Sequence, residues 1–174
     1  TGTITEYTGE SYRLDVPETI DGVSVRTIGA NAFNGNWNLI YLTLPEGLTA
    51  IEDGAFESEY QLSFVEFPST LRTIGNRAFY NYRGGKLMLP EGLERIGDEA
   101  FYRCSVRGTL VLPEGLKEIG DSAFARSIFM HTLDLPSTLE TIGEHAFEDV
   151  SLSYVYMDGL TPPKVAKTAF AECT

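Results

Sequence analysis

The residues that could carry chemistry are few and widely spaced in this chain of 174 residues. Its two histidines, His131 and His145, and its two cysteines, Cys104 and Cys173, do not form the close pairs that bind metals. The sequence contains neither a glycine-rich phosphate loop nor a G-x-S-x-G nucleophile motif. We therefore expect a non-enzymatic protein without a cofactor or metal, in which both histidines are solvated.

Carboxylates are the one reactive group that recurs in a regular pattern. One column of a repeat holds Asp53, Asp98, Asp121 and Glu144, and a second column holds Glu46, Glu91 and Glu114. Calcium needs about six to eight oxygen ligands around one point, whereas stacked repeats would place these side chains in open lines. We expect them to cap turns and to keep the protein soluble, and calcium binding is the alternative.

These carboxylates belong to a repeat that fills most of the chain. The segment KLMLPEGLERIGDEAF begins at Lys86, and TLVLPEGLKEIGDSAF and TLDLPSTLETIGEHAF begin at Thr109 and Thr132. Each copy ends on an anchor phenylalanine, and the anchors are Phe33, Phe56, Phe79, Phe101, Phe124, Phe147 and Phe170. This nearly constant period predicts a solenoid of stacked coils, in which the anchors form one continuous ladder.

One repeat, residues 86–101, indicates how each coil is built. Leu87 and Leu89 alternate with outward residues, as in a short half-buried strand, and Pro90 ends that strand. Ile96 points inward from a second and less regular side of the coil. A single helical or 3₁₀ turn, capped by Asp98, is expected before the anchor. The glycine that follows Ile in most coils is expected to permit close packing rather than a positive φ.

The two ends and the cysteines depart from this pattern. Asp21-Gly22 lies between β-forming residues and predicts a hairpin, which would either cap the first coil or be a surface ornament. Cys104 and Cys173 occupy the same repeat position three coils apart, about 14 Å, which is beyond disulfide reach. We expect one domain over residues 1–174, with an irregular coil at 1–34, regular repeats at 35–150 and a degenerate coil at 151–174.

The charge of the chain excludes several classes of partner. The net charge is −12, from 25 acidic and 13 basic side chains, so phosphate-rich surfaces would repel the protein. We expect no binding to nucleic acid. No apolar stretch reaches the length of a membrane span, and we expect no membrane insertion.

The outward positions of the short strands carry an unusual share of large hydrophobic side chains. A solvated face would be polar throughout, whereas these positions include aromatic residues, Met and Val, as recognition surfaces do. The alternative is that β-forming residues simply favour strands. The candidate ligand-binding residues are Tyr41, Phe64, Glu66, Met88, Val111, Tyr154 and Tyr156.

The pattern L-x-x-L-x-L-P-x-x-L-x-x-I-G-x-x-A-F resembles the BspA-like leucine-rich repeats of bacterial surface proteins, and it covers about residues 14–173. The resemblance implies an α/β leucine-rich-repeat solenoid, mainly β, built as a right-handed curved stack of about seven 23-residue coils. It places short parallel strands, and with them the candidate residues, on the concave side. It also implies adhesion or protein recognition outside the cell and no catalytic residues.

We therefore expect a non-enzymatic recognition or adhesion module of a secreted or cell-surface bacterial protein. The expected ligand is a protein or peptide, such as host extracellular matrix or another surface protein. Weak self-association through the strand at residues 154–157 is a further expectation. The alternatives are a passive structural spacer and a carbohydrate-binding module, for which Tyr41, Tyr154 and Tyr156 would supply stacking platforms.

Overall fold

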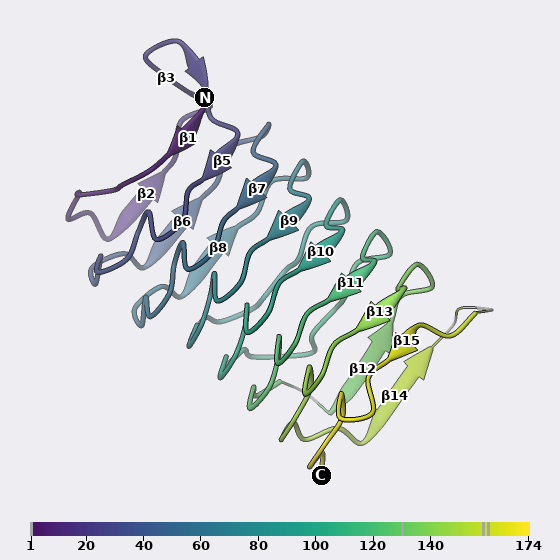
Figure 1. Ribbon diagram of the computed structural model, residues 1–174. Coiled ribbons are helices and arrows are strands. Elements are labelled where there is room, and N and C mark those ends of the chain that lie inside the picture. Colours follow the sequence, from purple (N-terminus) through teal and green to yellow (C-terminus); the bar gives the residue numbers. More distant parts are fainter. Residues whose placement is uncertain (1, 130, 158, 160) are drawn as a thin grey trace.

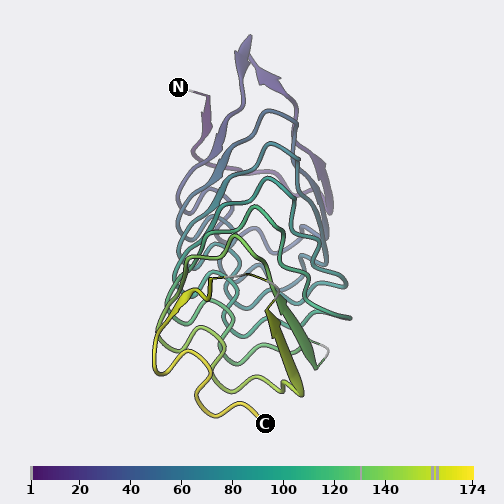
Figure 2. The ribbon, with the colours of Figure 1, turned by 90° about the vertical axis from the view of Figure 1, so that its right-hand side faces the viewer.

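The chain forms an elongated stack of about seven coils, with its two termini at opposite ends (Figures 1 and 2). This computed structural model describes residues 2–129, 131–157, 159 and 161–174, and the part of the chain that it describes contains no helix. The predicted solenoid of parallel strands is confirmed. The right-handed sense of the stack and its concave side stay predictions.

One wall of the stack is a continuous parallel sheet (Figure 1). Its strands, in spatial order, are β1 (Thr3–Ile4), β5 (Thr27–Ile28), β7 (Ala50–Ile51), β9 (Thr73–Ile74), β10 (Arg95–Ile96), β11 (Glu118–Ile119), β13 (Thr141–Ile142) and β15 (Lys164–Val165). We call this wall the continuous sheet. The sequence predicts that this side of the coil is the less regular one, and that prediction is wrong.

The second wall contains the strands that the sequence predicted, but its hydrogen bonding is interrupted. β2 (Arg13–Asp15), β6 (Tyr41–Thr43) and β8 (Phe64–Glu66) form one sheet, and β12 (Thr132–Leu135) and β14 (Tyr154–Met157) form another. Isolated bridges from Asp134 of β12 to Val111 and from Val111 to Met88 extend the second of these sheets, and among the described residues no bridge links Met88 to β8. The interruption lies at the coil where the step between anchors, from Phe79 to Phe101, is 22 residues instead of 23. The connection at residues 80–85, before Lys86, is therefore one residue shorter than the connections of the neighbouring coils.

The anchor phenylalanines form the predicted ladder through the core. Six of the seven rings are at most 1% exposed, and consecutive ring centroids are 4.7 to 5.4 Å apart in stacked pairs. Tyr7 adds a further ring, 5.0 Å from Phe33, at the N-terminal end. Because no coil can bury its own apolar edge, this ladder makes each coil depend on its neighbours.

The expected helical turn before each anchor does not form. Glu99, two residues before Phe101, has a φ of 52°, and the equivalent residue of the other regular coils also has a positive φ. A second positive φ follows each anchor by two residues, as at Arg103, with a φ of 55°. A left-handed residue breaks a right-handed helix. These backbone N–H groups instead reach the next coil, as from Glu99 to the carbonyl of Asp121 at 2.8 Å.

The predicted hairpin near the N-terminus is confirmed. β3 (Thr19–Ile20) and β4 (Val23–Ser24) pair in antiparallel fashion. The turn residues Asp21 and Gly22 both have a positive φ, as a two-residue hairpin turn requires. The hairpin extends beyond the N-terminal end of the stack (Figure 1).

Candidate recognition site

All seven candidate residues lie on the outer side of the second wall. In β6 and β8, Leu42 and Val65 are buried, whereas Tyr41 and Phe64 beside them are exposed. The alternation of a β-strand therefore directs one set of side chains into the core and the other into solvent. We call the outward surface of this wall the aromatic face, defined by Tyr41, Phe64, Glu66, Met88, Val111, Tyr154 and Tyr156.

The structure divides the aromatic face into two clusters. Tyr41 and Phe64 are paired across β6 and β8, with their ring centroids 6.4 Å apart. Met88 and Val111 are bridged on the following two coils and are 61% and 62% exposed. Phe64 and Met88 line one shallow pocket of about 510 Å³, together with Glu66. Five candidate residues thus come together near the middle of the stack.

The second cluster lies at the C-terminal end. Tyr154 and Tyr156 project from β14, with stacked ring centroids 6.0 Å apart. Polar residues of β12 lie between them and the first cluster, because Thr132 and Asp134 pair with these two tyrosines. The alternation of the strand predicts that Val155, between the two tyrosines, is buried in the core. It is instead 44% exposed, because β14 pairs with β12 alone among the described strands.

The continuous sheet has the opposite surface chemistry. Glu94 lies between Arg72 and Lys117, with N–O distances of 3.9 and 2.9 Å, and Arg95 lies 3.1 Å from Glu118. Each of these salt bridges joins side chains of two neighbouring coils, so the acidic and basic groups on this wall neutralise one another. Exposed pairs of this kind add little stability, but they leave a polar and self-paired surface. The seven residues of the aromatic face form no salt bridge with one another, and their large hydrophobic side chains stay exposed.

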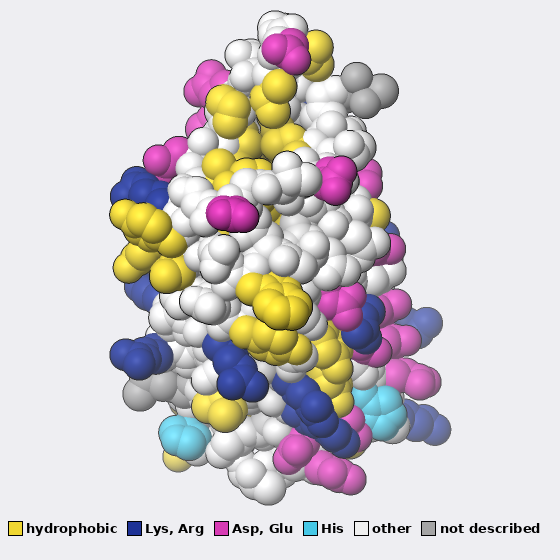
Figure 3. All heavy atoms as spheres, turned by 90° about the vertical axis from the view of Figure 1, so that its left-hand side faces the viewer, with side chains coloured by type: hydrophobic (Ala, Val, Ile, Leu, Met, Phe, Trp, Pro, Cys, Tyr) yellow, Lys and Arg dark blue, Asp and Glu magenta, His cyan; other side chains and the backbone are white. Residues whose placement is uncertain are grey.

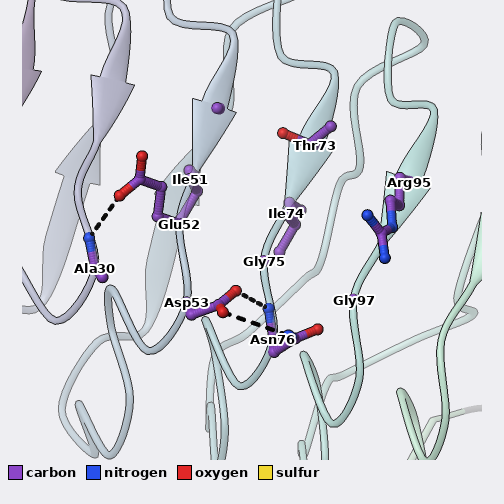
Figure 4. A pocket seen from close by; sticks show the side chains of 11 residues that line it. Ala30, Ile51, Glu52, Asp53, Thr73, Ile74, Gly75, Asn76, Arg95 and Gly97 are labelled. Atoms are coloured by element: carbon purple, nitrogen blue, oxygen red, sulfur yellow. Dashed lines mark hydrogen bonds between the residues drawn. The ribbon is translucent and has the colours of Figure 1, made fainter.

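The first acidic column does not cap turns within its own coil (Figure 4). Asp53 accepts a hydrogen bond from the backbone N–H of Asn76 at 2.7 Å, in the next coil. Asn76 and Asp98 in turn accept from the next backbone N–H groups, both at 2.8 Å. Asp121 continues the ladder to the N–H of Glu144 at 2.7 Å. The expectation of turn capping was therefore wrong, because these oxygens satisfy donors of the neighbouring coil.

The glycine column beside this ladder permits the close approach of the coils. A Cβ atom built on Gly75 would lie 2.6 Å from Asp53 Oδ1 and 2.7 Å from the Asp53 backbone nitrogen. Gly97 would meet Asn76 in the same way, and neither glycine has a positive φ. The prediction that this column serves close packing is confirmed. The two glycines also line a shallow groove of about 420 Å³ on the continuous sheet (Figure 4).

The second acidic column also makes contacts between coils. Glu46 accepts hydrogen bonds from the backbone N–H and hydroxyl of Ser69, both at 3.0 Å. The Ser69 N–H lowers the pKa of the Glu46 carboxyl, and the hydroxyl adds to the effect. Glu114 makes the same two contacts to Ser137. Among the described residues, no three acidic, His or Cys side chains gather in a way that would hold a metal ion.

The column three residues after each anchor contains a feature that sequence analysis missed. Glu59 is 3% exposed, and its Oε1 accepts a hydrogen bond from the Asn36 backbone N–H at 3.1 Å. Its Oε2 has no hydrogen-bond partner, and neither has Asn36 Oδ1. Burial raises the pKa of Glu59 to about 7. A carboxyl group stands here where other coils have neutral side chains.

Both cysteines belong to the same column and are free thiols, as predicted. Cys104 is buried with its sulfur 3.4 Å from the Phe79 carbonyl oxygen, and Cys173 Sγ lies 3.0 Å from that of Phe147. Burial raises the pKa of the Cys104 thiol, which keeps it protonated and unreactive. Ser127, in the same column, donates to the Phe101 carbonyl at 2.7 Å.

A variant with Cys104→Ser and Cys173→Ser should therefore melt at the same temperature with and without reductant. The serine hydroxyls can make the contact that Ser127 already makes, so the fold should be retained. The unmodified protein should be equally indifferent, because no sulfur–sulfur bond is present to reduce. Calorimetric scans of both proteins check this, and a parent protein that loses several degrees on reduction would contradict the assignment.

A leucine-rich-repeat solenoid is the class of protein that this fold and its columns define. The BspA type leucine rich repeat family matches residues 26–153 in six copies. The match covers most of the chain, so the protein belongs to this family.

Solved structures have the same fold. A leucine-rich-repeat protein from T. pallidum is 26% identical, with a TM-score of 0.74, and the match covers 89% of this chain and 76% of that one. A leucine-rich cell surface protein from Faecalibacterium prausnitzii A2-165 is 24% identical, with a TM-score of 0.62 over 92% of this chain. The chain spans about half, 51%, of that protein. None of the curated proteins matches.

Proposed function

We propose that this chain is a non-enzymatic recognition module that binds a protein or peptide ligand through the aromatic face. The observation that carries the proposal is the contrast between its two walls. On the continuous sheet, charged side chains form salt bridges between neighbouring coils, whereas the large hydrophobic side chains of the aromatic face are exposed to solvent. Exposed hydrophobic patches of this kind are typical of interaction sites.

The central cluster supplies the anchors for such an interface. Phe64 and Met88 lie beside one shallow pocket, with Tyr41 and Val111 on the flanking coils. Because the coils hold these residues in a rigid register, little conformational entropy would be lost on binding. Glu46, Glu66 and Glu91 line the pocket with a single basic residue, Lys86, and this excess of acidic groups would favour a ligand with a basic group beside its hydrophobic part.

We also propose that the protein is located outside the cell. The protein belongs to the BspA-type repeat family, and the F. prausnitzii structure is described as a cell surface protein. The part of the chain that the structure describes has no helix that could cross a membrane. We propose a secreted or surface-attached bacterial protein whose ligand is a host matrix protein or another surface protein.

Carbohydrate binding is the second candidate, and the C-terminal cluster favours it. Tyr154 and Tyr156 are exposed and stacked with each other, and neighbouring aromatic rings can also pack on sugars. A glycan array compared with a protein-ligand screen separates the two functions. Glycan binding that is lost on Tyr154→Ser and kept on Met88→Ser would favour the second candidate.

A double change at the central cluster tests the main proposal. Phe64→Ser with Met88→Ser should weaken capture of a matrix protein at least about thirtyfold, because central anchors carry about 2 kcal/mol or more of binding. The same change should cost only about 0.5–1 kcal/mol of folding stability, since both side chains point away from the core. Surface plasmon resonance and urea titration measure the two quantities.

The matched control is Arg95→Ser with Glu118→Ser, which removes a charge pair from the continuous sheet and keeps the net charge unchanged. Its affinity should equal that of the unmodified protein. Full capture by the folded Phe64/Met88 variant would instead indicate another binding surface or a spacer without a ligand.

A further inference from the structure

The connections that follow three central anchors form a basic surface on an acidic protein. Residues 80–85, 102–108 and 125–131 contain four arginines and no Asp or Glu, although the chain has 25 acidic residues. The four arginines, all exposed, are Arg83, Arg103, Arg107 and Arg126. We call this surface the arginine edge. Among the described residues, none of these arginines forms a salt bridge with a carboxylate.

Backbone hydrogen bonds hold these connections in register. Asn81 N–H donates to the Tyr102 carbonyl and Arg103 N–H to the Ala125 carbonyl, both at 2.9 Å. Arg103 and Arg126 therefore occupy the same position on consecutive coils, and both have a positive φ, of 55° and 57°. The anchor rings of these coils are 5.3 Å apart, which sets the spacing of the two arginines along the stack.

Aromatic side chains lie among the arginines. Tyr80 and Tyr102 stack with their ring centroids 5.1 Å apart and an interplanar angle of 12°. The guanidinium of Arg77 lies 4.1 Å from the Tyr80 ring centroid, and that of Arg103 lies 5.5 Å from the Tyr102 centroid. Ile128 is 69% exposed on the next coil. In Figure 3, which views the stack from the left-hand side of Figure 1, hydrophobic and basic side chains lie side by side on the lower half.

The stacking limits what this surface can bind. Tyr80 and Tyr102 are half-buried, and the Tyr80 ring already packs against both the Arg77 guanidinium and the Tyr102 ring. A sugar would need an open ring face on which to stack. The groups left available are the guanidinium N–H donors and the hydrophobic Ile128 side chain, and guanidinium groups match carboxylates in two-point hydrogen bonds.

We propose that the arginine edge binds an acidic peptide segment of a partner protein. The charge of the partner follows from the unpaired arginines, and its protein nature follows from the mixture of Arg and Tyr, which are enriched at protein interfaces over other surfaces. This site is separate from the aromatic face and does not depend on the function proposed for it. Arg77, paired with both Glu57 and Glu99, positions the tyrosines and is not part of the free charge.

Fluorescence anisotropy with a labelled oligoglutamate peptide tests the proposal on the whole chain. The peptide should bind at low salt, and its affinity should fall as the salt concentration rises. The variant Arg103→Glu with Arg126→Glu should bind at least about tenfold more weakly. Both changes should be accepted by the fold, because Asp149 and Glu172 already occupy this column with a positive φ.

The control variant, Arg26→Glu with Lys164→Glu, changes the net charge equally at exposed sites away from the arginine edge. It should retain most of the affinity. Equal loss in the control would overturn the proposal, because it would show that net charge alone decides binding. A protein that binds heparin but does not bind oligoglutamate would overturn the proposal and would indicate a sulfated glycan as the ligand. If the protein does not bind the peptide but associates with itself, and the variant Arg103→Glu with Arg126→Glu abolishes that self-association, the proposal is overturned and the arginine edge binds a second copy of the chain.

Discussion

Replacing Phe101 with alanine should lower the free energy of unfolding by about 3–5 kcal/mol. The ring is completely buried, and it stacks on Phe79 and Phe124 with centroid distances of 5.4 and 5.3 Å and interplanar angles of 3° and 6°. Its removal leaves a cavity in the middle of the ladder, which the neighbouring coils cannot fill without losing their own contacts. Urea denaturation followed by circular dichroism measures the change.

The control for this prediction is Phe170→Ala, at the C-terminal end of the ladder. Phe170 is only partly buried and stacks on Phe147 alone among the anchors, so its loss should cost clearly less. Because contacts are between neighbouring coils, hydrogen exchange in the Phe101 variant should increase in the coils on both sides. A cost below about 1 kcal/mol for Phe101→Ala would contradict the ladder as the main source of stability.

Glu59→Gln should make the protein more stable at pH 8 and leave its stability unchanged near pH 4. Burial raises the pKa of Glu59 to about 7 in the folded protein, from an ordinary value of 4.5. The folded state therefore holds this proton more tightly than the unfolded chain does. Stability from this group is fully present below the unfolded pKa and is lost as pH rises through the folded pKa, by about 3 kcal/mol in total.

The glutamine removes the ionisation but keeps an oxygen that can accept from the Asn36 N–H. Its amide also adds a donor in a region where Asn36 Oδ1 has no partner. Urea titrations from pH 4 to pH 8 measure the difference between variant and parent, and exposed Glu10→Gln is the control. If the difference in free energy of unfolding between the variant and the parent does not grow between pH 5 and pH 8, ionisation of Glu59 does not destabilise the folded protein, which would contradict the prediction.

The repeat made most of the fold predictable. The anchor spacing specified the stacked coils and the ladder, Asp21-Gly22 specified the hairpin, and the Leu alternation placed Tyr41 and Phe64 outward. Each of these is a local pattern with a fixed period. The columns of the candidate site follow directly from that period, so all seven candidate residues were found on one face.

The features that sequence analysis missed depend on the distance between coils. Asp98 resembles a turn cap within its own repeat, but its oxygen is closer to a donor of the next coil. The positive φ values before and after the anchors had a signal, because Asn31, Gly54 and Asn81 occupy those columns and such residues favour that conformation. Glu59 had a weaker signal, as the one carboxylate in a column of otherwise neutral residues.

The most direct test of the proposed recognition surface is photo-crosslinking from chosen positions of the intact solenoid. A benzophenone amino acid would replace Val111 on the aromatic face, or Thr73 on the continuous sheet, in separate variants that are each bound to the same captured matrix protein. We predict a covalent adduct from position 111 and none from position 73. An adduct from position 73 with none from position 111 would contradict binding through the aromatic face.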